Sequence, residues 1–541
     1  MNNKNPDWWK SAVIYQIYPR SFADSNGDGV GDLPGIVSRL DYLSALGIDA
    51  VWLSPVFCSP QDDNGYDISD YRDIDPLFGS LDDMRTLIRE ADARGIRVIL
   101  DLVLNHSSDE HAWFEAARRD RNSPYHDYYI WRDGVPGTPP NGLRAAFGGS
   151  AWEWEPAVGQ YYFHQFSKKQ PDLNWENPAL RAELYDMIRF WVGEGVGGFR
   201  LDVVDHLGKD PDRMITVNGP RLHEFIREMR REAFREDWLV TVGEAWSADP
   251  DSAVLYSDPG GSELSMVFQF EHILLDQTGP EKWDLAPLPF VRFKEVIARW
   301  QTSLAGRGWN SLFWENHDLP RIVSRWGDDG AYRAQSAKML AALLFGLQGT
   351  PYIYQGQELG MTNARYQPED YRDIETLNVW RERIGRGMEP ADVLRSIHAK
   401  SRDNARTPMQ WTDGENAGFT TGTPWLRVNP NHTEINAEQQ ESDPDSVLRF
   451  YRRLIQLRRD NPVFRDGAFR LLLPEDGDVF AYTRTDGGQE LLVQCNFHGE
   501  EIADPLAGCE RGACLIANYP DEAPGRLRPY EARMYLTPLR G

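Results

Sequence analysis

The sequence predicts a (β/α)8 TIM barrel, of the α/β class, with a subdomain inserted after its third strand and an antiparallel β domain at its C-terminal end. Short apolar strands alternate with amphipathic helices over the first hundred residues, and the alternation returns later until eight strands are counted. Strand–helix alternation implies parallel strands joined by crossover helices, and eight such strands close a barrel. Beyond residue 466 the pattern changes to successive strands, which is typical of an antiparallel domain.

The first part of the barrel is expected over residues 1–106. Its three strands are predicted at residues 12–18, 48–56 and 97–104. The helices between these strands carry apolar residues at helical spacing, and they end at Gly47 and Gly95. The apolar residues are Ile36, Leu40, Leu43 and Leu46 in the first helix, and Met84, Leu87, Ile88 and Ala91 in the second.

Residues 107–172 form the predicted inserted domain, because they are rich in Trp, Tyr, Pro, Gly and charge and show no long period. The barrel is expected to continue over residues 173–465, with an irregular segment at residues 360–445 after the eighth strand. Its five remaining strands are predicted at residues 198–202, 238–246, 265–270, 311–318 and 350–354. A helix that starts at Asn177-Pro178 and is broken by Gly193, Gly195 and Gly197 precedes the fourth strand.

The C-terminal β domain is assigned to residues 466–541. Residues 479–485 and 490–497 read as two strands, and Asp486-Gly487-Gly488 between them is a turn sequence, so these residues predict a hairpin. A helix with Val447, Phe450, Tyr451, Leu454 and Leu457 on one face is expected just before this domain.

Composition excludes several classes of partner. The 541 residues carry 58 basic and 83 acidic side chains, a formal net charge of -25, which argues against nucleic acid and anionic membranes and fits a small neutral substrate. No apolar run is long enough to span a membrane, and residues 1–7 contain no apolar signal region. The four cysteines match no metal or disulfide framework. We expect a cytoplasmic protein that is a monomer or a weak homodimer.

Polar side chains stand at the predicted C-terminal ends of several barrel strands, where barrel enzymes keep their reacting groups. They are Asp101, Asn105 and His106 on the third strand, Arg200 and Asp202 on the fourth, Glu244 on the fifth, and Asn316, His317 and Asp318 on the seventh. Arg200 and Asp202 point to the same face because side chains alternate along a strand. The cation is expected to keep Asp202 ionised as a covalent nucleophile, although an ordinary strand-end salt bridge explains this pair equally well.

Three converging carboxyl groups are unfavourable unless the protein uses their charge. Glycoside hydrolysis needs this inventory, because one carboxylate attacks the anomeric carbon while one carboxylic acid protonates the leaving oxygen. A third charge can stabilise the oxocarbenium-like transition state. Crowding of the carboxyl groups is expected to raise the pKa of the acid.

Four ordered segments resemble the signature segments of the α-amylase superfamily of glycoside hydrolases: residues 101–106, 198–202, 242–246 and 313–318. The resemblance runs from about Trp8 to Trp411. Within the superfamily the chain is similar to the oligo-1,6-glucosidase and dextran glucosidase (glucan 1,6-α-glucosidase) group. Three segments resemble motifs of that group: residues 15–20, 64–71 and 402–411.

The resemblance implies a role for each carboxyl group. Asp202 would be the nucleophile, Glu244 the general acid/base and Asp318 the transition-state stabiliser, which gives retention of the α configuration by double displacement. It also implies that six residues line a closed pocket for the non-reducing glucose and force exo action: Asp63, Tyr66, His106, Arg200, His317 and Arg402.

The linkage preference is implied by the residue after the nucleophile. Val203 at this position accompanies α-1,6 specificity in the resembled group, whereas Thr accompanies α-1,4 specificity. Trp246, Lys282 and Glu375 resemble residues that hold the second sugar in dextran glucosidases. The interval from Asp202 to Glu244 is short, and such a short loop leaves the acceptor side open to longer chains.

The loop at residues 24–32 resembles a calcium loop. Oxygen side chains at positions 1, 3, 5 and 9 and a glycine at position 6 match an EF-hand loop, but position 12 is Gly35 rather than Glu. The resemblance implies structural Ca²⁺, and a metal-free loop of Asx turns is the alternative. The implied ligands are Asp24, Asn26, Asp28, the Val30 carbonyl and Asp32.

The first hypothesis is therefore an exo-acting α-1,6-glucosidase that acts on isomaltose, isomalto-oligosaccharides or dextran ends. A close rival is an α-1,4-glucosidase or transglucosylase on the same scaffold, and sucrose or trehalose isomerisation is a weaker one. A non-catalytic binding relative is the alternative from a different class. Such relatives carry a membrane anchor and lack catalytic carboxyl groups, whereas this chain has all three carboxyl groups and shows no anchor.

Overall fold

A computed structural model describes residues 6–539 of the chain. The chain forms two compact units. The first unit comprises Trp52–Ala93 and Arg97–Gln269, and the second comprises Asp7–Val51, Arg94–Ile96 and the chain from Phe270 on. Strand β2 (Ala50–Leu53) crosses the boundary between the units.

Eight strands form the barrel sheet, in the order β11-β10-β9-β5-β2-β1-β13-β12. The pairs β5–β9, β9–β10, β10–β11, β1–β13 and β12–β13 are all parallel. The strands are β1 (Ile14–Ile17), β2, β5 (Arg97–Leu102), β9 (Gly198–Leu201), β10 (Val240–Glu244), β11 (Met266–Phe268), β12 (Ser311–Leu312) and β13 (Thr350–Tyr354). Each predicted barrel strand is present, and the predicted fold class is confirmed.

The seventh strand is much shorter than predicted. Strand β12 ends at Leu312, and residues 313–318 form a loop, so Asp318 lies beyond the end of its strand. The sequence of residues 313–318 is apolar only at its start, and Glu315 pairs with Arg321 instead of continuing a ladder. Asp318 therefore belongs to the loop that follows β12 and not to the strand itself.

Crossover helices separate the barrel strands, as the alternation predicts. The helix expected before the second strand is two helices, α1 (Leu33–Ser38) and α2 (Leu40–Leu46), because the backbone of Arg39 leaves the helical region between them. Helix α5 (Pro178–Glu194) begins at the cap Asn177 and ends at Gly195, whose positive φ of 98° suits glycine. Gly193 lies inside α5 and does not break it. The others are α3 (Leu81–Ala93), α6 (Leu222–Glu232), α7 (Pro250–Tyr256), α8 (Phe290–Ser303), α9 (Ile322–Trp326) and α10 (Arg333–Phe345).

Between β5 and α5 the first unit contains a small separate sheet. Strands β6 (Trp131–Asp133), β8 (Gln160–Phe163) and β7 (Trp152–Glu155) pair antiparallel in that order. Ile130, Trp152, Tyr161 and Phe163 form its buried core, so the aromatic residues of this stretch are largely structural. Helix α4 (Ala112–Ala117) belongs to the same stretch, and strands β3 (Phe57–Cys58) and β4 (Asp70–Ile74) pair in the loop after β2.

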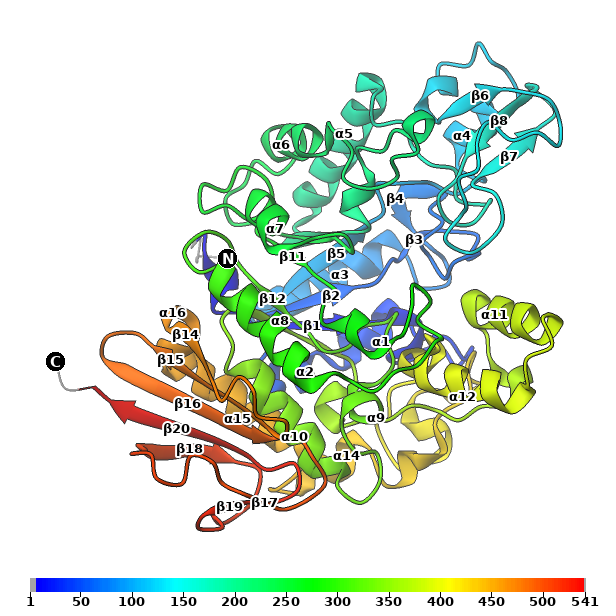
Figure 1. Cartoon of the computed structure of the whole chain (residues 1–541). Helices are drawn as coiled ribbons and strands as arrows, with labels where there is room; N and C mark the ends of the chain where they lie inside the picture. Colours follow the sequence, from blue (N-terminus) through cyan, green and yellow to red (C-terminus); the bar gives the residue numbers. More distant parts are fainter. Residues whose placement is uncertain (1–5, 540–541) are drawn as a thin grey trace. The chain divides into compact units, whose positions relative to one another are not determined.

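The second unit ends in a five-stranded antiparallel sheet, drawn in orange and red in Figure 1. Its order is β14-β15-β16-β20-β18, and the predicted hairpin is formed by β15 and β16, with Thr485 opposite Glu490. The strands are β14 (Ala468–Leu472), β15 (Val479–Thr485), β16 (Gln489–Asn496), β18 (Ala513–Ala517) and β20 (Ala532–Pro538), with β17 (Ile502–Ala503) and β19 (Arg526–Leu527) paired beside them. The Tyr482 hydroxyl donates to the Leu343 carbonyl of α10 at 2.7 Å, which anchors the sheet to that helix.

Short helices fill the segment between β13 and this sheet. They are α11 (Ile374–Gly385), α12 (Pro390–Lys400), α13 (Asp403–Arg406), α14 (Ala437–Ser442), α15 (Val447–Asp460) and α16 (Val463–Asp466). Helices α11 and α12 share an apolar core with Trp283, Tyr366 and Tyr371. Residues 360–445 therefore contain ordered helices, which the irregular sequence pattern did not predict.

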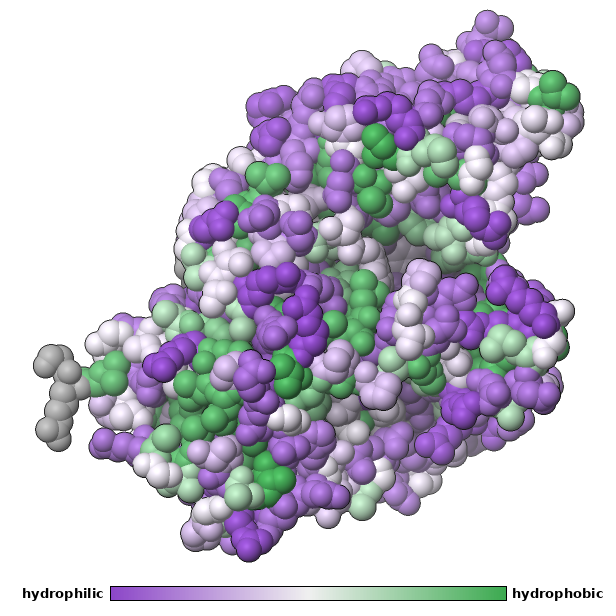
Figure 2. All heavy atoms as spheres, in the orientation of Figure 1, coloured by the Kyte–Doolittle hydropathy of each residue, from purple (hydrophilic) through white to green (hydrophobic). Residues whose placement is uncertain are grey.

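Three further properties concern the surface, the helices and the cysteines. Hydrophilic side chains cover most of the face drawn in Figure 2, in keeping with the strongly charged composition. Within residues 6–539, none of the helices combines the length and the apolar character that crossing a bilayer requires. The cysteines Cys58, Cys495, Cys509 and Cys514 are all free thiols.

Candidate active site

Arg200, on β9, joins three carboxyl groups in the first unit. Its Nη1 lies 2.8 Å from Asp101 Oδ1 and 2.8 Å from Asp202 Oδ1, and its Nη2 lies 2.6 Å from Glu244 Oε2. All four side chains are buried. The carboxyl groups come from the ends of β5, β9 and β10, so parallel neighbouring strands deliver them to one guanidinium. Asp202 and Glu244 therefore face the same site rather than separate cavities.

Two N–H donors fix the carboxyl group of Glu244. The Val203 backbone N–H donates to Oε2 at 3.2 Å, and the Trp246 indole donates to Oε1 at 3.0 Å. Val203 has φ 34° and ψ 51°, a left-handed conformation that β-branched residues rarely adopt. This conformation directs the Val203 N–H at Glu244, so local backbone strain accompanies the orientation of the predicted acid/base.

The pKa of Asp202 differs from its expected behaviour. Burial raises the pKa of Asp202 well above its usual range, and the charges of Glu244 and Asp101 raise it further, while Arg200 opposes them. Burial likewise raises the pKa of Asp101 to about 6, despite Arg200. Arg200 lowers the pKa of Asp202, as expected of a neighbouring cation, but its one guanidinium is divided among three buried carboxyl groups.

Asp63, Tyr66 and His106 lie together in the first unit. Gln170 Nε2 connects them, at 3.3 Å from Asp63 Oδ2, 3.3 Å from the Tyr66 carbonyl and 3.2 Å from His106 Nε2. The Tyr66 hydroxyl donates to Asp101 Oδ2 at 3.1 Å, which links this group to the Arg200 cluster. Burial lowers the pKa of His106 to about 4, so its ring is neutral at pH 7.

Two arginines and a histidine surround Asp318 in the second unit. Arg406 Nη2 lies 2.7 Å and Arg402 Nη1 lies 3.3 Å from Asp318 Oδ1, and His317 Nε2 lies 3.2 Å from Oδ2. Burial opposes ionisation of Asp318, but these neighbours hold its pKa well below its usual range. Asp318 is therefore ionised at any working pH.

Lys282 and Glu375, which were expected to hold the second sugar, form an ion pair in the second unit. Lys282 Nζ lies 2.5 Å from Glu375 Oε2, and Arg402 Nε lies 3.6 Å from the same oxygen. Both side chains of the pair are about one quarter exposed, so a ligand can reach them.

Residues 16–467 match the alpha amylase catalytic domain, which is most of the chain. The chain belongs to the alpha-amylase family. The prediction of a glycoside hydrolase of this family is confirmed.

Several alpha-amylase family proteins are similar to this chain over nearly its full length. It is 52% identical to an oligo-1,6-glucosidase of Parageobacillus thermoglucosidasius over 98% of each chain. It is 55% identical to a glucan 1,6-alpha-glucosidase of Streptococcus pneumoniae over 91% of this chain and 92% of that one. Among solved structures, the isomaltulose synthase of Klebsiella sp. LX3 is 42% identical, with a TM-score of 0.95 over 98% of this chain and all of its own.

The sequence did not identify several residues that contact the predicted site residues. Asp101 stood among the strand-end residues but received no role, and Arg406 lay inside a quoted motif without one. Asp373 and Gln170 are not among the predicted site residues. A single sequence does not show which distant side chains they contact, such as Arg402, which lies 29 positions after Asp373. For Arg406, the sequence contains one indication of a functional role, which is that it lies within the motif of residues 402–411.

The loop of residues 24–32 is folded by Asx turns. Asp24 Oδ1 accepts from the N–H groups of Asn26 and Gly27, and its Oδ2 accepts from Gly29 N–H and the Thr420 hydroxyl. Asp32 Oδ1 caps α1 through Gly35 N–H at 2.6 Å. All four acceptor positions of the Asp24 carboxylate are thus used. Over residues 6–539 no three acidic, His or Cys side chains are grouped closely enough to hold a metal ion.

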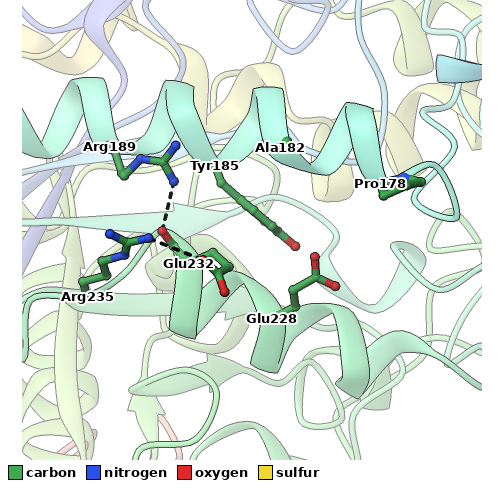
Figure 3. A pocket seen from close by; sticks show the side chains of 7 residues that line it. All are labelled: Pro178, Ala182, Tyr185, Arg189, Glu228, Glu232 and Arg235. Carbon is green, nitrogen blue, oxygen red and sulfur yellow. Dashed lines mark hydrogen bonds and ion pairs between the residues drawn. The ribbon is translucent and has the colours of Figure 1, made fainter.

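A surface pocket of about 500 Å³ lies between α5 and α6, away from the barrel strand ends (Figure 3). Arg189 donates to the Glu232 backbone carbonyl at 3.0 Å and Arg235 donates to the Glu232 carboxylate at 3.4 Å, so Glu232 already accepts from both arginines of this pocket. None of the predicted site residues lines it. The lining residues are Pro178, Ala182, Tyr185, Arg189, Glu228, Glu232 and Arg235.

Proposed function

We propose that the protein is an exo-acting, retaining α-glucosidase that releases glucose from the non-reducing ends of α-1,6-linked glucosides such as isomaltose, isomalto-oligosaccharides and dextran ends. The observation that carries this proposal is the joint binding of Asp202 and Glu244 to Arg200, at 2.8 and 2.6 Å. A retaining glycosidase needs two carboxyl groups facing one anomeric carbon. The named activities of the two relatives at 52% and 55% identity support the α-1,6 linkage.

In the proposed first step, Asp202 attacks the anomeric carbon while Glu244 gives its proton to the glycosidic oxygen, so the C–O bond breaks and the acceptor sugar leaves. In the second step Glu244 takes a proton from water, the water oxygen attacks the anomeric carbon, and the bond to Asp202 breaks. Asp318, held ionised by its cations, is proposed to stabilise the oxocarbenium-like transition state. Two inversions at one carbon give α-glucose.

The cluster supplies the proton that the first step needs. It holds three carboxyl groups and one guanidinium, and burial raises the pKa of Asp101 to about 6 and that of Asp202 further. We propose that the cluster keeps one proton near neutral pH. We propose that substrate binding places this proton on Glu244, because the glycosidic oxygen accepts from an acid and the anomeric carbon requires Asp202 as an anion.

Contacts to the non-reducing glucose are proposed for six residues. Tyr66 is proposed to stack on the ring, and Asp63 and Arg402 to hold its far hydroxyl groups, which restricts cleavage to chain ends. His106, Arg200 and His317 complete the set. Because burial keeps His106 neutral, it is proposed to act as a hydrogen-bonding group and not as a charge.

The linkage preference is proposed to depend on Val203 and on the acceptor-side residues Trp246, Lys282 and Glu375. Trp246 is 37% exposed while its indole holds Glu244, so it offers a ring beside the acid/base. Transglucosylation, or α-1,4 cleavage, is the second candidate function. The isomaltulose synthase at a TM-score of 0.95 supports the first of these, because its name describes the formation of a sugar and not hydrolysis.

Three secondary proposals follow from the sequence. We propose a structural Ca²⁺ at Asp24, Asn26, Asp28, the Val30 carbonyl and Asp32. The oxygen donors suit a hard cation, but Asp24 must release one of its four hydrogen bonds to bind it. Free thiols at all four cysteines support a cytoplasmic location. A monomer or weak homodimer stays a prediction that sedimentation analysis tests.

Asp202→Asn tests the proposed mechanism directly. The variant is expected to keep the fold and to lose hydrolysis of isomaltose, because an amide is a poor nucleophile. Glu263→Gln is the matched control, since Glu263 is a buried carboxylate that pairs with Arg227 and His223 outside the Arg200 cluster. Substantial turnover by Asp202→Asn, at an unchanged melting temperature, would reject Asp202 as the nucleophile.

A further inference from the structure

An alternating series of charges runs through the second unit, from the predicted acceptor-side pair to Asp318. Neighbouring members lie at nitrogen–oxygen distances of 2.5, 3.6, 2.6, 3.7 and 2.7 Å. In order, the members are Lys282, Glu375, Arg402, Asp373, Arg406 and Asp318. Asp373 is the carboxylate between the two arginines.

We propose that Asp373 is a positioning residue of the reaction: it holds Arg402 and Arg406 in the geometry in which they orient Asp318. The role assigned to Asp318 rests on the proposed function. The assignment to Asp373 rests on the contacts of its two carboxylate oxygens, which serve different purposes.

One carboxylate oxygen of Asp373 caps a helix. Oδ2 accepts from Thr376 N–H at 3.0 Å and from the Thr376 hydroxyl at 2.7 Å, which caps the N-terminus of α11. The Asp373 backbone is fixed as well, because its N–H donates to Asp403 Oδ2 at 3.0 Å. The carboxylate is therefore held on a rigid element and cannot move with the arginines that it binds.

The other oxygen of Asp373 receives the arginines. Oδ1 lies 2.8 Å from Arg402 Nε and 2.6 Å from its Nη2, a two-pronged contact, and 3.7 Å from Arg406 Nη1. Arginine side chains lose much rotamer freedom when they are held in one geometry, so an anchor of this kind decides where their remaining N–H groups point. Those remaining groups, Arg402 Nη1 and Arg406 Nη2, both contact Asp318 Oδ1.

Exposure separates Asp373 from the residues that a substrate can touch. The side chain of Asp373 is 0% exposed, whereas those of Asp318 and Glu375 are 23% and 27% exposed. The two ends of the series are thus open to a ligand and its centre is closed. Asp373 acts through its neighbours and contacts no substrate itself.

When Asp373 loses its charge, Arg402 and Arg406 lose the carboxylate that they share on one side, and Asp318 is the carboxylate that they still share. The guanidinium of Arg402 then moves toward Asp318 or Glu375, and Asp318 shifts with it. A displacement of about 1 Å in a catalytic group costs on the order of 100-fold in rate. We expect this cost in kcat more than in KM, because Asp318 acts on the transition state.

Asp373→Asn separates positioning from capping, because Asn caps helices as well as Asp does and carries no charge. The expected result is a melting temperature close to that of the wild type with kcat on p-nitrophenyl α-glucoside reduced about 100-fold and KM changed less. Asp373→Ser, another capping residue without charge, gives the same result if the Asn variant does not fold. Asp249→Asn is the matched control: Asp249 caps α7 through Ser252 N–H at 2.8 Å, so the same substitution there is expected to keep both the melting temperature and kcat.

A kcat within threefold of the wild type in folded Asp373→Asn would overturn the proposal, as would an equal loss of kcat in Asp249→Asn. The aryl glucoside makes the outcome independent of linkage. If the wild type cleaves p-nitrophenyl α-glucoside but not isomaltose, the proposed α-1,6 function fails and the role of Asp373 is still decided.

Discussion

Replacing Arg200 by glutamine removes the guanidinium that three buried carboxyl groups share. Removal of one partner from a buried ion pair costs about 3–5 kcal/mol, because the remaining charge stays in the interior without compensation. Arg200 contacts Asp101, Asp202 and Glu244 at 2.6–2.8 Å, so the loss applies to three carboxyl groups at once. The variant can lower this free-energy cost by binding further protons at the three carboxyl groups.

Proton uptake makes the stability of Arg200→Gln depend on pH. Arg200 lowers the pKa of Asp101, which is about 6 in its presence, so its removal raises that pKa further above the value of roughly 4 in the unfolded chain. Between these two values the folded state binds more protons than the unfolded state, and the free energy of unfolding therefore rises as pH falls. Each added unit of pKa difference corresponds to about 1.4 kcal/mol.

Melting temperatures of wild type and Arg200→Gln at pH 5 and pH 7.5 measure this effect. We expect the variant to melt well below the wild type at pH 7.5 and to recover part of the difference at pH 5, with kcat reduced about 100-fold or more at both pH values. Arg85→Gln is the control, because Arg85 pairs with Glu194 and Asp82 at a half-exposed position. Equal melting temperatures of Arg200→Gln and wild type at pH 7.5 would refute the reasoning.

Two other outcomes test the remaining assignments. Val203→Thr is expected to raise the rate on maltose relative to isomaltose by a factor that corresponds to about 1–3 kcal/mol, measured as a ratio of kcat/KM values; an unchanged ratio would remove Val203 from the linkage argument. Chelation is expected to lower the melting temperature by loosening the loop at Asp24 and Asp32, with little effect on kcat at low temperature, and an unchanged melting curve would leave the loop as a set of Asx turns.

The barrel was predictable because its information is local. Apolar strands, helical spacing and glycines act within a few residues, and Gly47 and Gly195 end their helices as predicted. The length of β12 was not predictable in the same way: the strand ends at Leu312, and Glu315 in the following loop pairs with Arg321, which lies outside the predicted strand.

The site was predictable only in part, for a different reason. Strand ends located Asp202, Glu244 and Arg200 and implied that they meet. The pKa of Asp202 depends on burial and on how many carboxyl groups share Arg200, and neither quantity is a property of the local sequence. Asp373 was missed for the same reason, since its function depends on Arg402, which lies far along the chain.

The central claim is that Asp202 and Glu244 cleave an α-1,6 bond in two inverting steps. Proton NMR of isomaltose hydrolysis by the wild-type protein, recorded before mutarotation, tests it most directly. The account predicts α-glucose as the first-formed anomer and an initial rate on isomaltose above that on maltose. First appearance of β-glucose, or cleavage of maltose alone, would contradict it.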